Sequence, residues 1–160
     1  MDPTTALRTA TLLSFPSALL LTGYTLSFSQ NILPALRDHK PQTTLPVFAA
    51  LWSRASLIVP TLTLLSGSAS AYLAYVLPGQ RREWTTAAAA MLLTLSWRAV
   101  VMMKGEQRLN EMSKDERVRA KSEMTLEHRQ LMVRWEKMNW VNVVLTMVSG
   151  VTGLLAVVKA

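Results

Sequence analysis

Apolar residues gather in four long stretches of the chain, and charged residues are confined to the segments between them. Residues 9–36, 55–80 and 138–158 contain no Asp, Glu, Lys, Arg or His. Each stretch exceeds the roughly 18–20 residues that an α-helix needs to cross about 30 Å of hydrocarbon. A fourth stretch, residues 85–103, has the length and holds Arg98 near its end. Charges would punctuate a water-soluble core every few residues, so the pattern favours helices that span a membrane.

We therefore predict an all-α fold, an integral membrane four-helix bundle in a single transmembrane domain over residues 1–160. The expected spans are residues 7–28, 55–77, 85–103 and 138–158. The composition agrees with this prediction, because 50% of the residues are hydrophobic and the mean hydropathy is +0.22. A soluble domain of 160 residues is ordinarily less apolar.

The segments between the predicted spans carry turn and charge signals. Three prolines within residues 34–46 predict an extended first loop rather than a helix. Pro78 and Gly79, followed by four polar residues, predict a tight connection that makes the second and third spans antiparallel neighbours. Residues 104–137 hold nine basic and seven acidic residues, and we expect them to form a charged helical extension of spans three and four.

The formal net charge of +7 indicates either nucleic acid or an anionic membrane surface as a partner. No basic stripe interleaved with aromatic residues is present, so we expect a lipid bilayer and no nucleic acid. Under the positive-inside rule the first and third loops lie in the cytosol. These loops hold Arg37, Lys40, Arg54 and nine further basic residues, against Arg8, Arg81, Arg82 and Lys159 elsewhere. We expect the membrane to be the endoplasmic reticulum or another endomembrane.

Several kinds of chemistry have no support in the sequence. There is no cysteine, which excludes thiolate metal sites, cysteine nucleophiles and disulfides. The two histidines, His39 and His128, form no H-x-x-x-H pattern, and we predict no metal site. The motifs of serine hydrolases, P-loop enzymes and dinucleotide-binding proteins are also missing.

One helical stripe of polar residues opens the predicted fourth span. Trp135, Asn139 and Asn142 fall at positions i, i+4 and i+7, which places them on one face of a helix. Two carboxamides and an indole on one face can hydrogen-bond and stack against a flat aromatic ligand. The alternative is that both asparagines simply bond to neighbouring helices, as polar side chains in membrane interfaces often do.

Other polar residues at the edges of the spans are further candidates, because a polar group in a bilayer is costly. Arg98, next to Trp97, either binds an anionic oxygen of a substrate or extends to the membrane surface. Gln30 and Asn31 could line the mouth of a pocket between helices. His39 in the proline-rich loop is a candidate acid or base, or an ordinary surface residue.

The chain resembles a known family on features that extend over most of its length. This family is the fungal anthrone oxygenases of aromatic polyketide pathways, which are small four-span membrane proteins. The resemblance rests on Ser29-Gln30-Asn31 before Pro34, Leu51-Trp52 before Pro60, Ala71-Tyr72-Leu73-Ala74-Tyr75, and Trp135 with Asn139. It implies oxidation of an anthrone to an anthraquinone by molecular oxygen, without a dedicated redox cofactor.

Two departures from the family pattern fall at candidate site positions. Lys104, Gly105 and Glu106 stand where the family tends to have a Pro-Thr-Asn stretch, and Asn142 stands where it tends to have an arginine. These differences leave open a different hydrophobic substrate, or a related proton-transfer, oxidation or cyclisation step.

The first hypothesis is therefore a membrane-embedded, oxygenase-like enzyme of secondary metabolism that binds a hydrophobic aromatic molecule between its helices. Its candidate acid–base or anion-stabilising residues are Glu106, His39 and Arg98, and its candidate substrate-binding residues are Asn139, Asn142, Trp135, Gln30 and Asn31. The second hypothesis is a non-catalytic bundle that scaffolds a partner or binds lipid. A cavity lined by the stripe of the fourth span favours the enzyme, whereas an interior closed at Gly67, Ala71 and Gly150 favours the scaffold.

Overall fold

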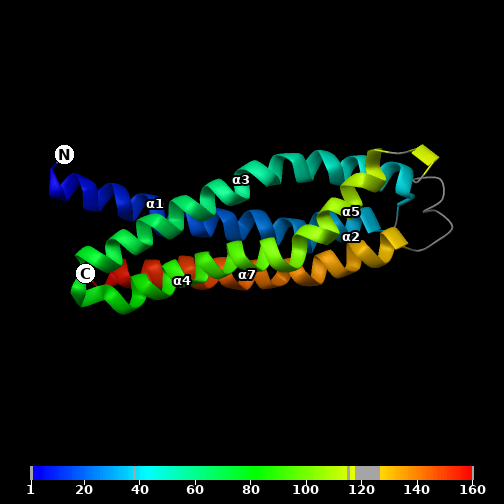
Figure 1. Cartoon of the computed structure of the whole chain (residues 1–160). Coiled ribbons are helices and arrows are strands. Elements are labelled where there is room, and N and C mark those ends of the chain that lie inside the picture. Colours follow the sequence, from blue (N-terminus) through cyan, green and yellow to red (C-terminus); the bar gives the residue numbers. More distant parts are fainter. Residues whose placement is uncertain (1, 38, 115, 118–126, 160) are drawn as a thin grey trace.

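The computed structural model describes residues 2–37, 39–114, 116–117 and 127–159, and all regular elements in these ranges are helical (Figure 1). The α-helices are α1 (Pro3–Ser27), α2 (Leu33–Arg37), α3 (Pro41–Val76), α4 (Arg81–Trp97), α5 (Met103–Lys114) and α7 (Glu127–Val158). Two π-helical turns, η1 (Phe28–Ile32) and η3 (Arg98–Met102), and one 3-10 turn, η2 (Pro78–Gln80), join them.

Four continuous helical segments are long and apolar enough to cross a membrane. They are Pro3–Arg37, Pro41–Val76, Pro78–Lys114 and Glu127–Val158, and their most apolar 18-residue windows have mean hydropathies of 1.2 to 2.1. Only 22–39% of the residues in these windows are buried within the bundle, so most of the apolar side chains face outward, as they do in helices surrounded by lipid. The predicted all-α four-helix fold of an integral membrane protein is confirmed.

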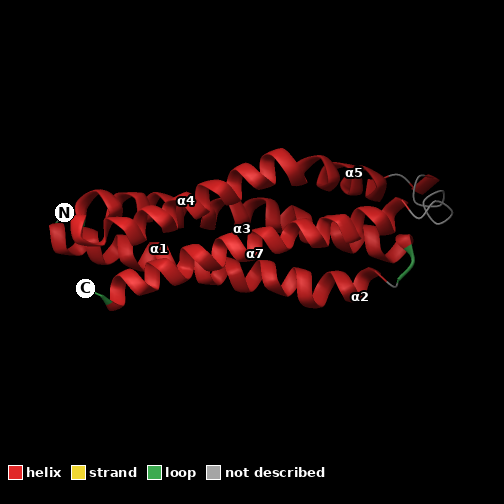
Figure 2. Cartoon of the chain, turned by 90° about the horizontal axis from the view of Figure 1, so that it is seen from below, coloured by secondary structure: helices red, strands yellow, loops and turns green. Residues whose placement is uncertain are grey.

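The four long segments form an up-and-down bundle (Figures 1 and 2). α1 packs against α3 and α7, and α4 packs against the same two helices, so the order around the bundle is α1, α3, α4, α7. Both chain termini and η2 lie at one end, which we call the terminal end. α2, α5 and the start of α7 lie at the other, which we call the α5 end.

The predicted extended first loop is wrong. Pro34 lies in the first turn of α2, Pro41 begins α3, and Pro46 lies inside the second turn of α3. A proline at the first position of a helix removes no hydrogen bond, because the amide at that position has no partner within the helix, and Pro41 stands at such a position. Pro34 and Pro46 lie inside long helical segments, which continue although each proline lacks an amide hydrogen to donate. The second long segment therefore starts at Pro41, about four turns before the predicted residue 55.

The predicted charged helical extension is helical where the structure describes it. α5 covers its first part and ends at Lys114, while α7 begins at Glu127 and continues without a break into the apolar stretch. Residues 118–126 lie outside the described part of the chain.

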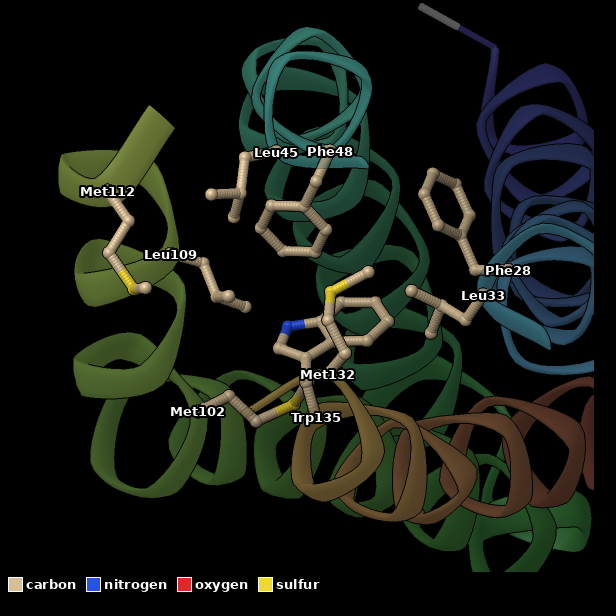
Figure 3. Close-up of a cluster of buried hydrophobic side chains, with 9 residues drawn as sticks. All are labelled: Phe28, Leu33, Leu45, Phe48, Met102, Leu109, Met112, Met132 and Trp135. Carbon is tan, nitrogen blue, oxygen red and sulfur yellow. The ribbon is translucent and has the colours of Figure 1, made fainter. Parts of the chain in front are cut away.

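Two hydrophobic clusters occupy the ends of the bundle. At the α5 end, Phe28, Phe48, Leu109, Met132 and Trp135 belong to a cluster formed by helices from all parts of the chain (Figure 3). At the terminal end a smaller cluster surrounds Trp84, which is 1% exposed and donates its indole N–H to Gln80 Oε1 at 3.1 Å.

Small residues fill the bundle between these clusters and let the helices approach closely. A Cβ placed on Gly153 of α7 would lie 2.7 Å from Phe15 Cβ, and one on Gly150 would lie 2.6 Å from Leu19 Cδ2. Both contacts are between α7 and α1, so the terminal half of this interface depends on glycine. Buried hydroxyl groups line the same region: Ser14, Ser17, Thr63, Ser66, Ser70, Thr146 and Ser149.

Candidate active site

The π-helical turn η3 brings Arg98 and Glu106 to the same side of their helix. The Met103 amide donates to the Arg98 carbonyl, a bond that encloses one residue more than an α-helical bond. Residues eight apart in an α-helix differ by about 80° in direction, and the additional residue takes up about 100°. The two side chains thus lie within about 20° of each other, and Arg98 Nη2 reaches Glu106 Oε2 at 3.5 Å.

Glu106 is a buried carboxylate held by three helical segments. Its residue is 4% exposed, and each of its oxygens accepts an indole N–H at 3.1 Å. Trp52 of α3 donates to Oε2 and Trp135 of α7 donates to Oε1. Together with Arg98, whose side chain is 16% exposed, these donors satisfy a charge that would otherwise be costly to bury.

The polar stripe of α7 faces the same region. Asn139 Nδ2 donates to Ser29 Oγ at 2.8 Å and to the Thr25 carbonyl at 2.9 Å, both on the α1–η1 segment. Asn142 Nδ2 lies 3.0 Å from Met102 Sδ and 3.4 Å from Asn139 Oδ1. Asn142 Oδ1 is buried and has no partner among the described residues, so it is free to accept a hydrogen bond.

A cavity of about 30 Å³ lies among these groups. Its walls come from every long segment of the bundle: Tyr24, Thr25, Phe28, Phe48, Trp52, Ala55, Val59, Arg98, Met102, Glu106, Trp135, Asn139 and Asn142. This space holds about one water molecule, so a three-ring ligand requires its walls to move apart.

Aromatic rings make up much of the cavity wall. Phe48 meets Trp135 edge to face with ring centroids 5.8 Å apart, and the Phe28 centroid lies 6.2 Å from that of Trp135 (Figure 3). Tyr24 packs against Phe28 at 5.0 Å. Such rings offer a flat aromatic molecule both stacking and edge contacts.

Five of the eight residues predicted for the site line this cavity, and three do not. Glu106, Arg98, Trp135, Asn139 and Asn142 surround it, as given above.

The three remaining residues are exposed. Gln30 and Asn31 lie in η1 with their side chains turned away from the cavity, and the neighbouring Ser29 faces inward instead. His39 lies between α2 and α3, where its carbonyl accepts from Thr44 Oγ1 at 3.3 Å. None of these three residues lines the cavity.

Several residues that line the cavity were not predicted from the sequence. Trp52 is one of them, and its indole N–H points to Glu106. Trp97 donates to the Met138 carbonyl at 3.1 Å and so joins η3 to α7, while the adjacent Arg98 faces inward rather than extending to the membrane surface. Phe28 and Phe48 had no signal beyond their hydrophobicity.

The arrangement offers a base, a cation and hydrogen-bonding carboxamides in a mostly apolar setting. The Glu106 carboxylate can accept a proton, and the Arg98 guanidinium can stabilise a negatively charged oxygen. Within the described ranges, no three side chains of His, Cys, Asp or Glu gather closely enough to hold a metal ion.

The comparison with protein families gives one match. The family model described as "Anthrone oxygenase" matches residues 48–152, more than half of the chain. The matched region runs from the first third of α3 into the last turns of α7, and it includes Trp52, Arg98, Glu106, Trp135 and Asn139. No curated protein and no solved structure matches the chain.

Proposed function

The chain belongs to the anthrone oxygenase family, and we propose that it oxidises a hydrophobic aromatic polyketide, an anthrone or a closely related phenol, within its bundle. Molecular oxygen is the co-substrate, and no dedicated redox cofactor takes part. The observation that carries the proposal is the buried Glu106 carboxylate, fixed by two indoles and a guanidinium in a cavity with aromatic walls.

In the proposed reaction Glu106 removes a proton from the methylene carbon opposite the carbonyl of an anthrone. The resulting anion is electron-rich and reacts with oxygen at that carbon. The carbon loses its second hydrogen and gains a C=O bond, while the other oxygen atom leaves as water, so the balance is anthrone plus O₂ to anthraquinone plus H₂O. Electrons come from the substrate, and the protein supplies proton transfer and charge stabilisation.

The other cavity residues have roles that follow from their hydrogen-bonding capacity. Arg98 lies beside Glu106 and stabilises the oxygen that becomes negative when the proton leaves. Asn142 Oδ1 is buried and has no partner among the described residues, and it accepts a hydrogen bond from a phenolic hydroxyl of the substrate. Asn139, fixed to Ser29 and Thr25, holds the α1 wall of the cavity in place.

The cavity must widen to admit this substrate. Met102 lines it with a flexible, unbranched side chain, and Trp52 is only partly buried at its edge. We propose that the substrate enters from the bilayer between α3 and its neighbours as these two side chains move. A hydrophobic substrate and oxygen both partition into lipid, so their concentrations around a membrane-embedded site are higher than in water.

The test measures quinone formation by membranes that contain the protein. Wild-type membranes are incubated with an anthrone under oxygen, and the quinone is quantified by chromatography. Glu106→Gln keeps the shape of the side chain and removes the base, so turnover is expected to fall about 100-fold or more. Asn139→Ala is expected to reduce turnover less, because it acts through positioning.

The matched control is Glu111→Gln on the same helix. Glu111 has a side-chain exposure of 67% and pairs only loosely with Arg108 at 4.0 Å. The Glu111→Gln variant removes the same charge from α5 without changing any residue that lines the cavity. If wild-type membranes form no more quinone than empty membranes, or if Glu106→Gln turns over like Glu111→Gln, the proposal fails for that substrate.

The small cavity also favours a second candidate, a bundle that scaffolds a partner and catalyses nothing. About 30 Å³ is far below the size of a tricyclic molecule, and Gly67 and Gly150 bring helices into close contact. This candidate requires that an anthrone does not bind. The test is binding of an anthraquinone, the oxidised form of the substrate, to the purified protein. Saturable binding that is lost in Trp135→Ala counts against the scaffold.

We further propose that the α5 end faces the cytosol in an endomembrane such as the endoplasmic reticulum. α2, which ends at Arg37, lies at this end together with α5 and the start of α7, and these elements and Lys40 carry most of the described basic residues, as the positive-inside rule requires of cytosolic segments.

A further inference from the structure

A groove of about 640 Å³ lies on the outside of the α5 end, separate from the cavity. It runs between α2 and the first turns of α7 and is bordered by four basic residues, Arg37, Arg129, Arg134 and Lys137. Val133 and Met138 form part of its floor. The groove therefore combines a concentration of positive charge with apolar surface.

Most of the positive charge in the groove has no ion-pair partner among the residues that the structure describes. Arg37 Nη1 pairs with Glu136 Oε2 at 3.7 Å, which accounts for one of the four cations. Arg129, Arg134 and Lys137 are exposed, and none of them has an ion pair with any residue that the structure describes. Three cations that have no ion pair within the described ranges thus surround one groove, and together they can bind a phosphate-type anion.

The basic face of α7 continues directly into an exposed apolar stripe. Val141, Val144, Val148, Val151 and Leu155 follow Lys137 at alternating spacings of three and four residues. This spacing keeps them within about 40° of the direction of Lys137 on the helix. Their exposed fractions are 36–57%, so each of them keeps a substantial part of its surface outside the described bundle.

We propose that this groove binds the headgroup of an anionic phospholipid, with an acyl chain lying along the valine stripe of α7. The cations meet the phosphate, and the stripe extends toward the membrane centre, as an acyl chain does. A free phosphate could bind the cations, but it makes no favourable contact with an apolar stripe that is about 21 Å long, from Val141 to Leu155. The site does not depend on the proposed oxygenase activity.

The test compares lipid binding by the purified full-length protein and two double variants. Arg134→Gln/Lys137→Gln removes two groove cations. Arg81→Gln/Arg82→Gln removes two exposed cations at the terminal end and is the matched control. Binding of dioleoyl phosphatidic acid, dioleoyl phosphatidylcholine and inorganic phosphate is measured by native mass spectrometry in detergent. Thermal unfolding of each variant verifies that it is folded.

We expect phosphatidic acid to bind more tightly than phosphatidylcholine. We expect the groove variant to lose about 30-fold in affinity for phosphatidic acid, since each basic residue near a membrane surface contributes about a factor of five. The control variant should change less than about threefold.

Three results would overturn the proposal. An equal loss in both variants shows a general charge effect, and an unchanged affinity in the groove variant shows that the lipid binds elsewhere. Displacement of phosphatidic acid by an equal concentration of inorganic phosphate shows a site for soluble anions.

Discussion

Replacing Glu106 with leucine should destabilise the α5 end of the bundle more than any substitution on the outer face of α5. Leucine has a similar volume but accepts no hydrogen bond, so the indole N–H groups of Trp52 and Trp135 lose their acceptor. Arg98 also loses its partner at 3.5 Å. Three donors are then left without their acceptor. The site is shielded from water, since Glu106 is only 4% exposed.

The magnitude follows from these contacts. A hydrogen bond to a charged group stabilises a protein by about 1.5–3 kcal/mol, and membrane proteins lie at or below the lower limit because their unfolded state finds other partners. Two such bonds and a partly exposed ion pair give about 3 kcal/mol for Glu106→Leu. Glu106→Gln keeps one acceptor oxygen, and we expect about 1–2 kcal/mol.

The assay is thermal unfolding in a mild detergent, followed by circular dichroism, with Glu111→Leu as the control. Glu111 has 67% of its side chain exposed, so its replacement should leave the unfolding temperature nearly unchanged. The double variant Arg98→Met/Glu106→Leu should lose less than the sum of its single variants, because it removes both charges. If Glu106→Leu unfolds at the same temperature as Glu111→Leu, the carboxylate does not hold the three segments together.

Two further predictions concern α7. Gly153→Ala should destabilise the bundle by about 1–3 kcal/mol in the same unfolding assay, because the added Cβ would lie 2.7 Å from Phe15 Cβ. The control is Gly23→Ala, whose added Cβ meets no described atom within 4 Å, and it should be neutral or stabilising. Asn142→Leu should change stability by less than about 1 kcal/mol, because the asparagine oxygen has no partner in the described part of the chain and its nitrogen mainly contacts Met102 Sδ. The same variant should nevertheless lower quinone formation about tenfold.

The fold could be predicted because it depends on a property of single segments. Residues 138–158 lack charge over a length that suits only a membrane-crossing helix, and α7 contains all of them. The prediction of an extended first loop is wrong because proline does not break a helix at every position. At Pro41 the missing amide has no helical partner to lose, so the same residue begins a helix instead.

The candidate site could be predicted only along one helix. The positions of Trp135, Asn139 and Asn142 on one face follow from helical spacing, and all three line the cavity. The pairing of Arg98 with Glu106 depends on the π-helical turn η3, and no residue pattern in the sequence predicts that turn.

Contacts between distant segments were out of reach for a different reason. The partner of Trp52 lies 54 residues away, and a single sequence does not indicate which distant residues meet. Gln30 and Asn31 have the polarity of site residues, but the turn η1 points them outward and leaves the inward place to Ser29.

The indoles of this chain also give it an internal set of optical reporters. Trp52 and Trp135 donate to the carboxylate at the cavity, while Trp84 lies in the cluster at the terminal end. Trp140 is 41% exposed on the outer surface of α7. A quinone in the cavity would quench the emission of the first two most strongly, so variants that keep single tryptophans can locate a bound ligand without any added label.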